Sequence, residues 1–206
     1  MQPALYIAQI TDTHLYADPH GQLLGLDTRH CLKQVIDLAL NIRAPDLVVA
    51  SGDLSHDGSP QAYRHLHACF SRLEAPIYCL PGNHDETEAL RANADCGRLF
   101  SSRSICIGGW LQVFLDSTVK GSEGGHLTET ELQDLDTALA SNPYLPDVVW
   151  FHHQPVDIGS QLLDTMAVDN PKAFFGIIEK HPKVRAVIWV HVHQTFERQR
   201  NDVRLL

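Results

Sequence analysis

Short runs of apolar residues recur along the chain, and polar or glycine residues follow each of them. Such runs, bounded by turn-forming residues, are typical of strands buried inside a sheet. The predicted strands cover residues 4–10, 46–50, 76–80, 111–115, 148–151 and 186–190.

Longer segments with helical spacing lie between several of these strands. The predicted helices cover residues 28–41, 59–73, 128–140 and 170–180. Thr128 followed by Glu131 fits a capping box, which supports a helix start at this point. Strands that alternate with helices predict an α/β fold with a substantial parallel sheet. In such sheets, ligands gather beyond the carboxyl ends of the strands.

Composition changes this picture only by narrowing the class of protein. A chain of 206 residues with 44% hydrophobic residues is long enough to bury one substantial core, and we expect a single domain over residues 1–206. The formal net charge of −9 argues against binding to nucleic acids or to anionic membrane surfaces, because a phosphate backbone or an anionic leaflet would repel the protein.

The cysteines indicate a reducing compartment. Their number is odd and no two have C-x-x-C spacing, so we expect buried thiols; they are Cys31, Cys69, Cys79, Cys96 and Cys106. The chain begins without a basic segment followed by an apolar one, and no apolar stretch approaches the length of a membrane span. We therefore expect a soluble, cytoplasmic protein.

Side chains of the kind that bind metals follow nearly every predicted strand. They are Asp12, His14, Asp53, Asn83, His84, His152, His153, His191 and His193. Each motif has an ordinary interpretation when taken alone, for example a turn at Gly52 and Asp53 or a loop at residues 81–85. Their occurrence together favours a metal site, because the ordinary interpretations are nearly independent of one another.

The order of these motifs resembles the calcineurin-like metallophosphoesterases. The chain has D-x-H at residues 12–14, G-D-x-x-x-D at 52–57, G-N-H-D at 82–85, H-x-x-P at 152–155 and H-x-H at 191–193. Within that family, residues 9–15, 115–118 and 125–128 are most similar to bacterial class III cyclic-AMP phosphodiesterases. The resemblance implies an α-β-β-α sandwich of two facing mixed sheets and hydrolysis of 3',5'-cyclic AMP to AMP.

The resemblance also implies a ligand set for two divalent metal ions. Asp12, His14 and His193 would hold the first ion; Asn83, His152 and His191 would hold the second; and Asp53 would bridge both. Iron and manganese are the expected metals, with zinc or cobalt also compatible with these nitrogen and oxygen ligands. A hydroxide between the ions would attack phosphorus.

Roles outside the ligand set follow from position in the motifs. His84 would contact the phosphate or protonate the leaving alkoxide. Asp57 and His153 would support the ligands rather than bind metal. We expect His56 to be a solvated residue without function, and residues 121–125 to form a plain flexible loop.

Two features depart from the family pattern. Val190 stands where the family has glycine, so a need for positive φ there would strain the backbone and displace His191 and His193. The last residues read as the start of a hairpin around Asn201 and Asp202, which leaves the second sheet short of strands. An unpaired sheet edge of this kind favours pairing with a second copy, so a homodimer is one expected state.

Two other functions fit the same motifs. The first is a broader phosphodiesterase or phosphomonoesterase that acts, for example, on glycerophosphodiesters. The second is a metal-poor scaffold of the same fold without catalytic activity, similar to the retromer subunit.

Overall fold

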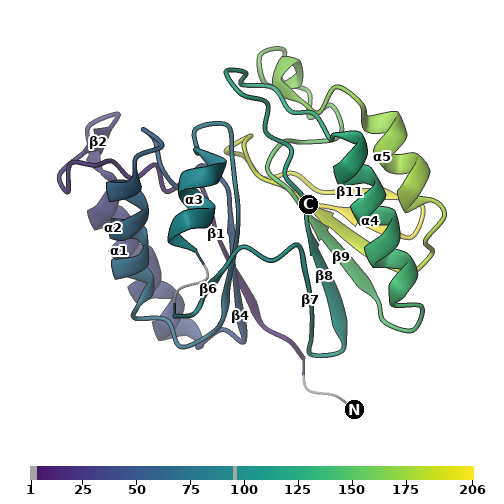
Figure 1. Cartoon of the computed structure of the whole chain (residues 1–206), viewed down its shortest axis with the longest axis horizontal. Coiled ribbons are helices and arrows are strands. Elements are labelled where there is room, and N and C mark those ends of the chain that lie inside the picture. The colour runs from purple at the N-terminus through teal and green to yellow at the C-terminus, as the bar shows by residue number, and fades with distance from the viewer. Residues whose placement is uncertain (1–3, 95–96) are drawn as a thin grey trace. The chain divides into compact units, whose positions relative to one another are not determined.

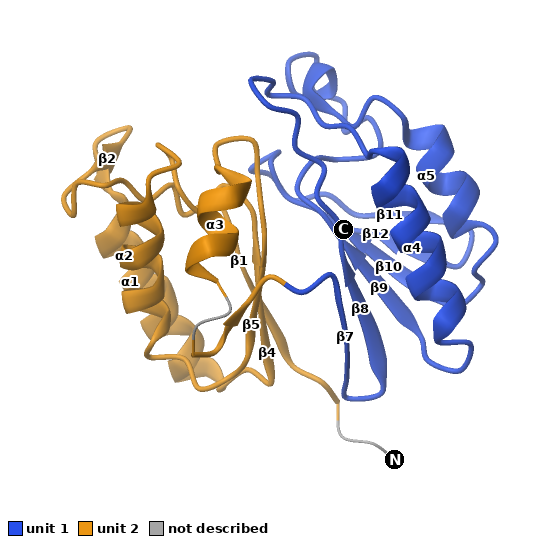
Figure 2. Ribbon diagram, viewed as in Figure 1, with its two compact units in different colours: residues 1–3, 102–206 blue, residues 4–101 orange. Residues whose placement is uncertain are grey.

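The computed structural model describes residues 4–94 and 97–206, so Cys96 lies outside the described residues. The chain divides into two compact units, residues 4–101 and residues 102–206 (Figure 2). Each unit has its own cluster of buried hydrophobic side chains. The single domain expected from chain length stays a prediction, and the units are considered in turn.

The first unit contains a four-stranded sheet in which every pair of neighbouring strands is parallel, in the order β1-β4-β5-β6 (Figure 1). Its elements are β1 (Ile7–Ile10), β2 (Gln22–Leu23), β3 (Leu26–Asp27), α1 (Thr28–Ile42), β4 (Leu47–Ser51), α2 (Pro60–Phe70), β5 (Ile77–Leu80), α3 (Thr87–Asn93) and β6 (Leu99–Phe100). Strands β2 and β3 form a separate antiparallel pair.

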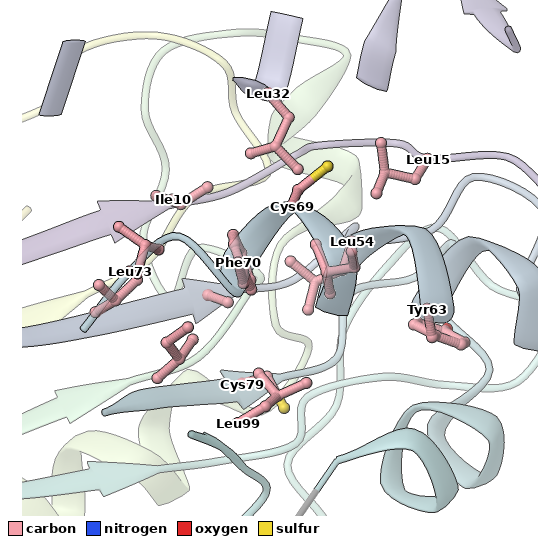
Figure 3. Close-up of a cluster of buried hydrophobic side chains, with 14 of the residues drawn as sticks. Ile10, Leu15, Leu32, Leu54, Tyr63, Cys69, Phe70, Leu73, Cys79 and Leu99 are labelled. Atoms are coloured by element: carbon pink, nitrogen blue, oxygen red, sulfur yellow. The ribbon is translucent and has the colours of Figure 1, made fainter. Parts of the chain in front are cut away.

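Local sequence explains where α1 and α2 begin. The Asp27 side chain accepts a hydrogen bond from the backbone N–H of His30 and caps α1. Ser59 caps α2 in the same way, and Pro60 occupies the first helical position, where it loses no helical hydrogen bond. Alternate residues of β4, such as Val48 and Ala50, belong to one hydrophobic cluster with residues of the helices. Figure 3 shows part of this cluster, including Leu32 of α1 and Phe70 of α2.

The second unit contains a six-stranded mixed sheet in the order β11-β12-β10-β9-β8-β7. Its elements are β7 (Ser104–Ile107), β8 (Trp110–Phe114), α4 (Glu129–Ser141), β9 (Asp147–Trp150), the 3-10 helix η1 (Leu163–Met166), α5 (Pro171–Ile178), β10 (Val184–Ile188), β11 (Arg198–Arg200) and β12 (Val203–Leu205). Strands β8, β9, β10 and β12 run parallel, whereas β7 and β11 are antiparallel to their neighbours.

The α/β class and each of the predicted strands and helices are present, with boundaries shifted by a few residues. The cap at Thr128 is confirmed, since its side chain accepts a hydrogen bond from Glu131 N–H. The hairpin around Asn201 is confirmed as β11 and β12. Among the helices of the described residues, none combines the length and apolar composition that a transmembrane segment requires.

The cysteine prediction holds only in part. The four cysteines within the described residues are free thiols, and Cys69 and Cys79 are buried. Cys106 is exposed, because it lies on the edge strand β7, where alternate residues face solvent.

One buried carboxylate of the second unit, that of Asp147, makes the stability of the protein depend on pH. Asp147 begins β9 and is 1% exposed. Within the part of the chain that is described, its Oδ1 atom has no hydrogen-bond partner. Burial raises the pKa of this carboxyl to about 6, against the opposing effect of His181, Lys183 and Arg185. The native state therefore binds this proton more tightly than the unfolded chain does, and stability contributed by this group falls as pH rises from about 4 to above 6.

We expect Asp147→Asn to raise the free energy of unfolding at pH 7.5 by on the order of 1 kcal/mol, because it removes a buried charge. The gain should shrink at pH 4.5, where the native carboxyl is already largely protonated. Urea unfolding at both pH values measures this difference. Asp202→Asn, a change at an exposed turn residue, is the control and should have little effect at either pH. Equal stability of Asp147→Asn and the native chain at both pH values would contradict the expectation.

Candidate metal centre

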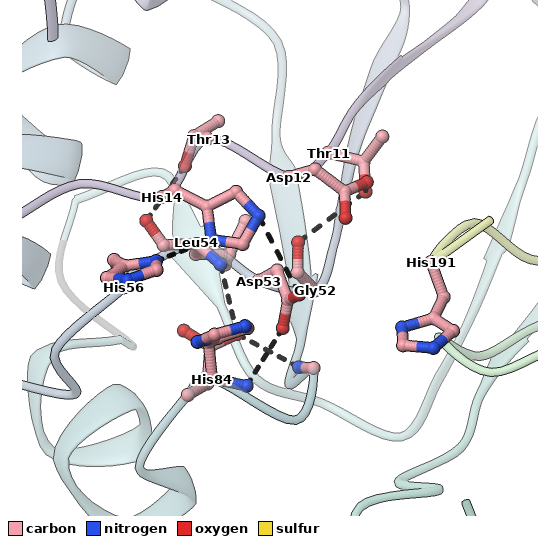
Figure 4. A network of polar contacts seen from close by, with 12 residues as sticks. Thr11, Asp12, Thr13, His14, Gly52, Asp53, Leu54, His56, His84 and His191 are labelled. Atoms are coloured by element: carbon pink, nitrogen blue, oxygen red, sulfur yellow. Dashed lines mark hydrogen bonds and ion pairs between the residues drawn. The ribbon is translucent and has the colours of Figure 1, made fainter. Parts of the chain in front are cut away.

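In the first unit, the loops that follow β1 and β4 are joined by backbone hydrogen bonds. Asp12 N–H donates to Gly52 O at 3.0 Å, and His14 N–H donates to Asp53 O at 2.9 Å. Leu15 N–H continues the series to Leu54 O at 3.1 Å. Because the two strands are parallel neighbours, this pairing brings the predicted ligands of both motifs to the same sheet edge (Figure 4).

The predicted ligands have an uncommon backbone conformation. Five of them have positive φ: Asp12 (50°), His14 (42°), Asp53 (49°), His191 (64°) and His193 (48°). Within the described residues, only Leu24 and Asn201 share this feature among those other than glycine. A left-handed residue with a side chain costs roughly 1–2 kcal/mol, and such strain is concentrated at functional sites. The strain therefore marks the same positions as the sequence motifs do.

The carboxylate of Asp85, a half-buried residue, joins the loops after β4 and β5. It accepts hydrogen bonds from the backbone N–H groups of Leu54 (3.0 Å), Ser55 (2.9 Å) and Gly82 (2.9 Å). The hydroxyl of Tyr63 donates to it as well, at 3.0 Å. Burial raises the pKa of this carboxyl to about 6, and the hydrogen bonds from the backbone oppose that rise. Sequence reasoning assigned Asp85 no role, although its place at the end of the G-N-H-D motif was a signal.

Gly82 lies against Asp53, the predicted bridging ligand. A Cβ atom on Gly82 would collide with the side chain and backbone nitrogen of Asp53. The close approach lets Asp53 Oδ1 accept a hydrogen bond from His84 N–H at 2.9 Å. Glycine at this position therefore allows the two motifs to meet.

The amide of Asn83 is suited to metal binding. Its Oδ1 atom is buried and has no hydrogen-bond partner among the described residues. A buried polar atom without a partner needs an explanation, and an unseen ion is one of the usual ones. Together with the carboxylate oxygens and imidazole nitrogens of the neighbouring loop, this oxygen fits the ligand preferences of divalent transition metals.

Three imidazoles of the first unit lie together. Ligand atoms of His14, His56 and His84 lie within 4.8 Å of one another. Burial lowers the pKa of His14 to about 4, so this ring is neutral at physiological pH, as a metal ligand must be. His56, expected to be a solvated residue without function, is half-buried, and its ring stacks on His84. Asp57 lies in the same loop as His56 and accepts hydrogen bonds from Ala17 N–H and Ser59 N–H, which hold that loop in place.

In the second unit, a cluster of histidines lies beyond β9 and β10. Ligand nitrogens of His152, His153 and His191 lie within 4.8 Å of one another, and all three residues are buried. His191 Nδ1 is 3.2 Å from His152 Nε2. The backbone joins the two loops as well, since Val190 N–H donates to His152 O at 3.0 Å. His193 lies two residues beyond His191 and is exposed.

The departure at Val190 does not strain the backbone as expected. Val190 is not among the residues with positive φ; the left-handed conformation occurs instead at His191 and His193. The valine is therefore not in the left-handed conformation, and a glycine there would relieve no left-handed strain.

The loop at residues 121–125 is more than a flexible connection. Gly125 is buried, forms a bridge with Val168, and its missing Cβ would lie only 2.6 Å from the His153 ring. Ser117 Oγ is 2.8 Å from Nδ1 of the same ring and accepts a hydrogen bond from His153 N–H at 3.3 Å. These contacts fix the orientation of His153, as expected for a residue that supports a neighbouring ligand.

The structure thus assembles two groups of predicted site residues. Asp12, His14, Asp53, Asn83 and His84 belong to the first unit; His152, His153, His191 and His193 belong to the second. Both groups offer ligands for divalent metals.

Comparison with known proteins gives a consistent result. The family model described as calcineurin-like phosphoesterase matches residues 5–195. The 3',5'-cyclic adenosine monophosphate phosphodiesterase CpdA of Pseudomonas aeruginosa is 36% identical, over 98% of this chain and 75% of that protein. The 3',5'-cyclic-nucleotide phosphodiesterase alr5338 of Nostoc sp. is 35% identical, over 97% of this chain and 76% of that protein.

Solved structures share the fold at low sequence identity. A dimetal phosphatase from Danio rerio superposes with a TM-score of 0.71 and 14% identity, covering 98% of this chain and 86% of that chain. The phosphopantetheinyl hydrolase PptH of Mycobacterium tuberculosis superposes with a TM-score of 0.61 and 12% identity, covering 100% of this chain and 89% of that chain.

We expect Gly125→Ala to displace the His153 ring and lower the free energy of unfolding by roughly 1–3 kcal/mol, because the added methyl group overpacks a buried site. Gly124→Ala is the matched control: its Cβ would meet its nearest neighbour at 3.6 Å, an ordinary contact. Urea unfolding of the two variants measures the difference. Equal losses in both would show that the contact between Gly125 and His153 does not matter.

Proposed function

The chain belongs to the calcineurin-like phosphoesterase family, and from this premise we propose that it hydrolyses 3',5'-cyclic AMP to AMP in a metal-dependent reaction. The observation that carries the proposal is the left-handed backbone at Asp12, His14, Asp53, His191 and His193. Strained backbone is retained where function needs it, and the five strained residues are all among the seven ligands that the family motifs predict. The names of the relatives support the choice of substrate.

The proposed ligand set is the one that the motifs imply. Asp12, His14 and His193 would hold one ion, and Asn83, His152 and His191 the other. Asp53 would contact both ions, and its burial keeps water from competing for the carboxylate. When bound, two divalent ions supply Lewis-acid chemistry and make water available as a nucleophile at neutral pH. Iron and manganese are the proposed metals.

His84 would deliver the proton. It is exposed, whereas its backbone is fixed by the hydrogen bond from its N–H to Asp53 Oδ1. Opening the cyclic phosphodiester breaks the bond between phosphorus and the O3' oxygen, which leaves as an alkoxide of high basicity. An imidazole that protonates this oxygen lowers the barrier to bond cleavage. The cytoplasmic location and the homodimer stay predictions from the sequence.

The proposal is tested by measuring turnover of cyclic AMP, cyclic GMP, bis-p-nitrophenyl phosphate and a glycerophosphodiester. We expect chelation to abolish turnover and Mn²⁺ to restore it, and we expect cyclic AMP to be hydrolysed most efficiently. Asp53→Asn should lose activity together with the rise in melting temperature that Mn²⁺ gives the native chain, because ions that bind only the folded state stabilise it. Activity that survives complete metal removal would contradict the proposal, and a glycerophosphodiester preference would favour the broader phosphodiesterase.

We expect His84→Ala to lower turnover of cyclic AMP by roughly 10²–10⁴-fold without loss of Mn²⁺ binding. The loss should be smaller for bis-p-nitrophenyl phosphate, because p-nitrophenolate is a stable anion that leaves without protonation. Steady-state kinetics on both substrates measures the two losses. The control is His30→Ala, a change at an exposed histidine of α1. Equal losses on the two substrates would exclude proton donation and leave phosphate binding as the role of His84.

A further inference from the structure

His56 has no role in the proposed function, yet its ring contacts three other rings, two of which belong to predicted site residues. It stacks on His84 with a centroid distance of 4.7 Å and an interplanar angle of 20°. It packs against Tyr16 at 4.7 Å and meets His14 edge-on at 5.3 Å. His56 thus belongs to a cluster of three rings with the predicted metal ligand His14 and the predicted proton donor His84, which also contact each other at a centroid distance of 5.0 Å (Figure 4).

The contact between His56 and His14 defines a hydrogen bond. His14 Nε2 lies toward Asp53, 3.8 Å from Oδ2, whereas His14 Nδ1 is 3.3 Å from His56 Nδ1. Two imidazole nitrogens in contact need one donor and one acceptor. A histidine that binds metal through one nitrogen usually donates from the other. His14 therefore donates from Nδ1, His56 accepts at Nδ1, and the proton of neutral His56 resides on Nε2.

We propose that His56 is a positioning residue for both neighbours. Its Nδ1 atom fixes the orientation of His14, with Nε2 directed toward Asp53 and available to a metal ion. Its ring face holds the His84 imidazole, which is otherwise exposed, in one orientation for proton transfer. The second part rests on the proposed function; the first part concerns metal binding alone.

The side chain of His56 is dispensable for the path of the loop. The backbone N–H of His56 donates to Leu15 O at 2.8 Å whatever the side chain is. The following residues are held by Asp57, which accepts a hydrogen bond from Ser59 N–H at 3.0 Å. Replacing the imidazole therefore tests its contacts while the loop stays paired.

Three substitutions separate the two contacts. His56→Asn retains an acceptor near the position of Nδ1 but lacks a ring, His56→Phe retains a ring without an acceptor, and His56→Ala has neither. The first readout is the dissociation constant of Mn²⁺, measured by calorimetry on metal-free protein. We expect it to rise roughly 10–100-fold in His56→Ala and His56→Phe, the usual effect of removing a partner of a ligand, and to stay near the native value in His56→Asn.

The second readout is the ratio of kcat for cyclic AMP to kcat for bis-p-nitrophenyl phosphate at saturating Mn²⁺. We expect this ratio to fall roughly tenfold in His56→Ala and His56→Asn, which is less than the full rate contribution of a general acid. We expect His56→Phe to retain the native ratio. If His56 only supported the loop, its replacement would lower kcat for both substrates by the same factor and leave the ratio unchanged. His30→Ala, at an exposed position of α1, is the control for both readouts.

Each outcome decides one part of the proposal. Native Mn²⁺ affinity in His56→Ala, or equal loss in His56→Asn and His56→Phe, would overturn the hydrogen bond to His14. An unchanged kcat ratio in His56→Ala would overturn the contact with His84. If the native chain hydrolyses neither substrate, the proposed function fails, while the Mn²⁺ measurements still decide whether His56 positions His14.

Discussion

The site in the first unit depends on one interaction: the Asp85 carboxylate accepts hydrogen bonds from three backbone N–H groups. A loop beyond a parallel strand leaves the sheet and loses the partners for its backbone polar groups. Asp85 supplies those partners for the loops after β4 and β5 at once. The positions of Asp53, Asn83 and His84 follow from this anchor, because all three lie in the loops that it joins. A buried carboxylate is costly by itself, and the convergent N–H groups and the Tyr63 hydroxyl offset that cost.

A second constraint concerns the space beside the predicted site residues of each unit. Two glycines occupy positions where any Cβ would collide with a site residue: Gly82 against Asp53, and Gly125 against His153. Five of the seven predicted ligands have side chains at positions where the backbone conformation favours glycine. Glycine thus occurs where a Cβ atom would collide with a neighbouring side chain, whereas strained backbone occurs where a ligand side chain is needed. Local stability is given up at a site whose residues are selected for chemistry.

The sequence was sufficient for features that depend on neighbouring residues. Apolar runs located the strands, the Thr128 side chain marked the start of α4, and the motifs placed ligand-type residues at strand ends. It was insufficient where contacts join distant segments. The stack of His56 on His84 joins residues 28 positions apart, and the hydrogen bond between Ser117 and His153 spans 36 positions. The family motif, with its glycine, led us to expect strain at Val190, but the first left-handed residue is His191. The error arose because φ cannot be read from residue type alone.

The division into two units has a spectroscopic consequence. All three tryptophans of the chain lie in the second unit: Trp110, Trp150 and Trp189. The indole of Trp150 is buried and donates to Gln112 Oε1 at 2.8 Å, so its emission is sensitive to the integrity of that unit's core. Intrinsic tryptophan fluorescence therefore reports directly on the second unit, whereas circular dichroism reports on both. Coincident transitions from the two probes would indicate cooperative unfolding, and separate ones would show that each half of the ligand set can be lost independently.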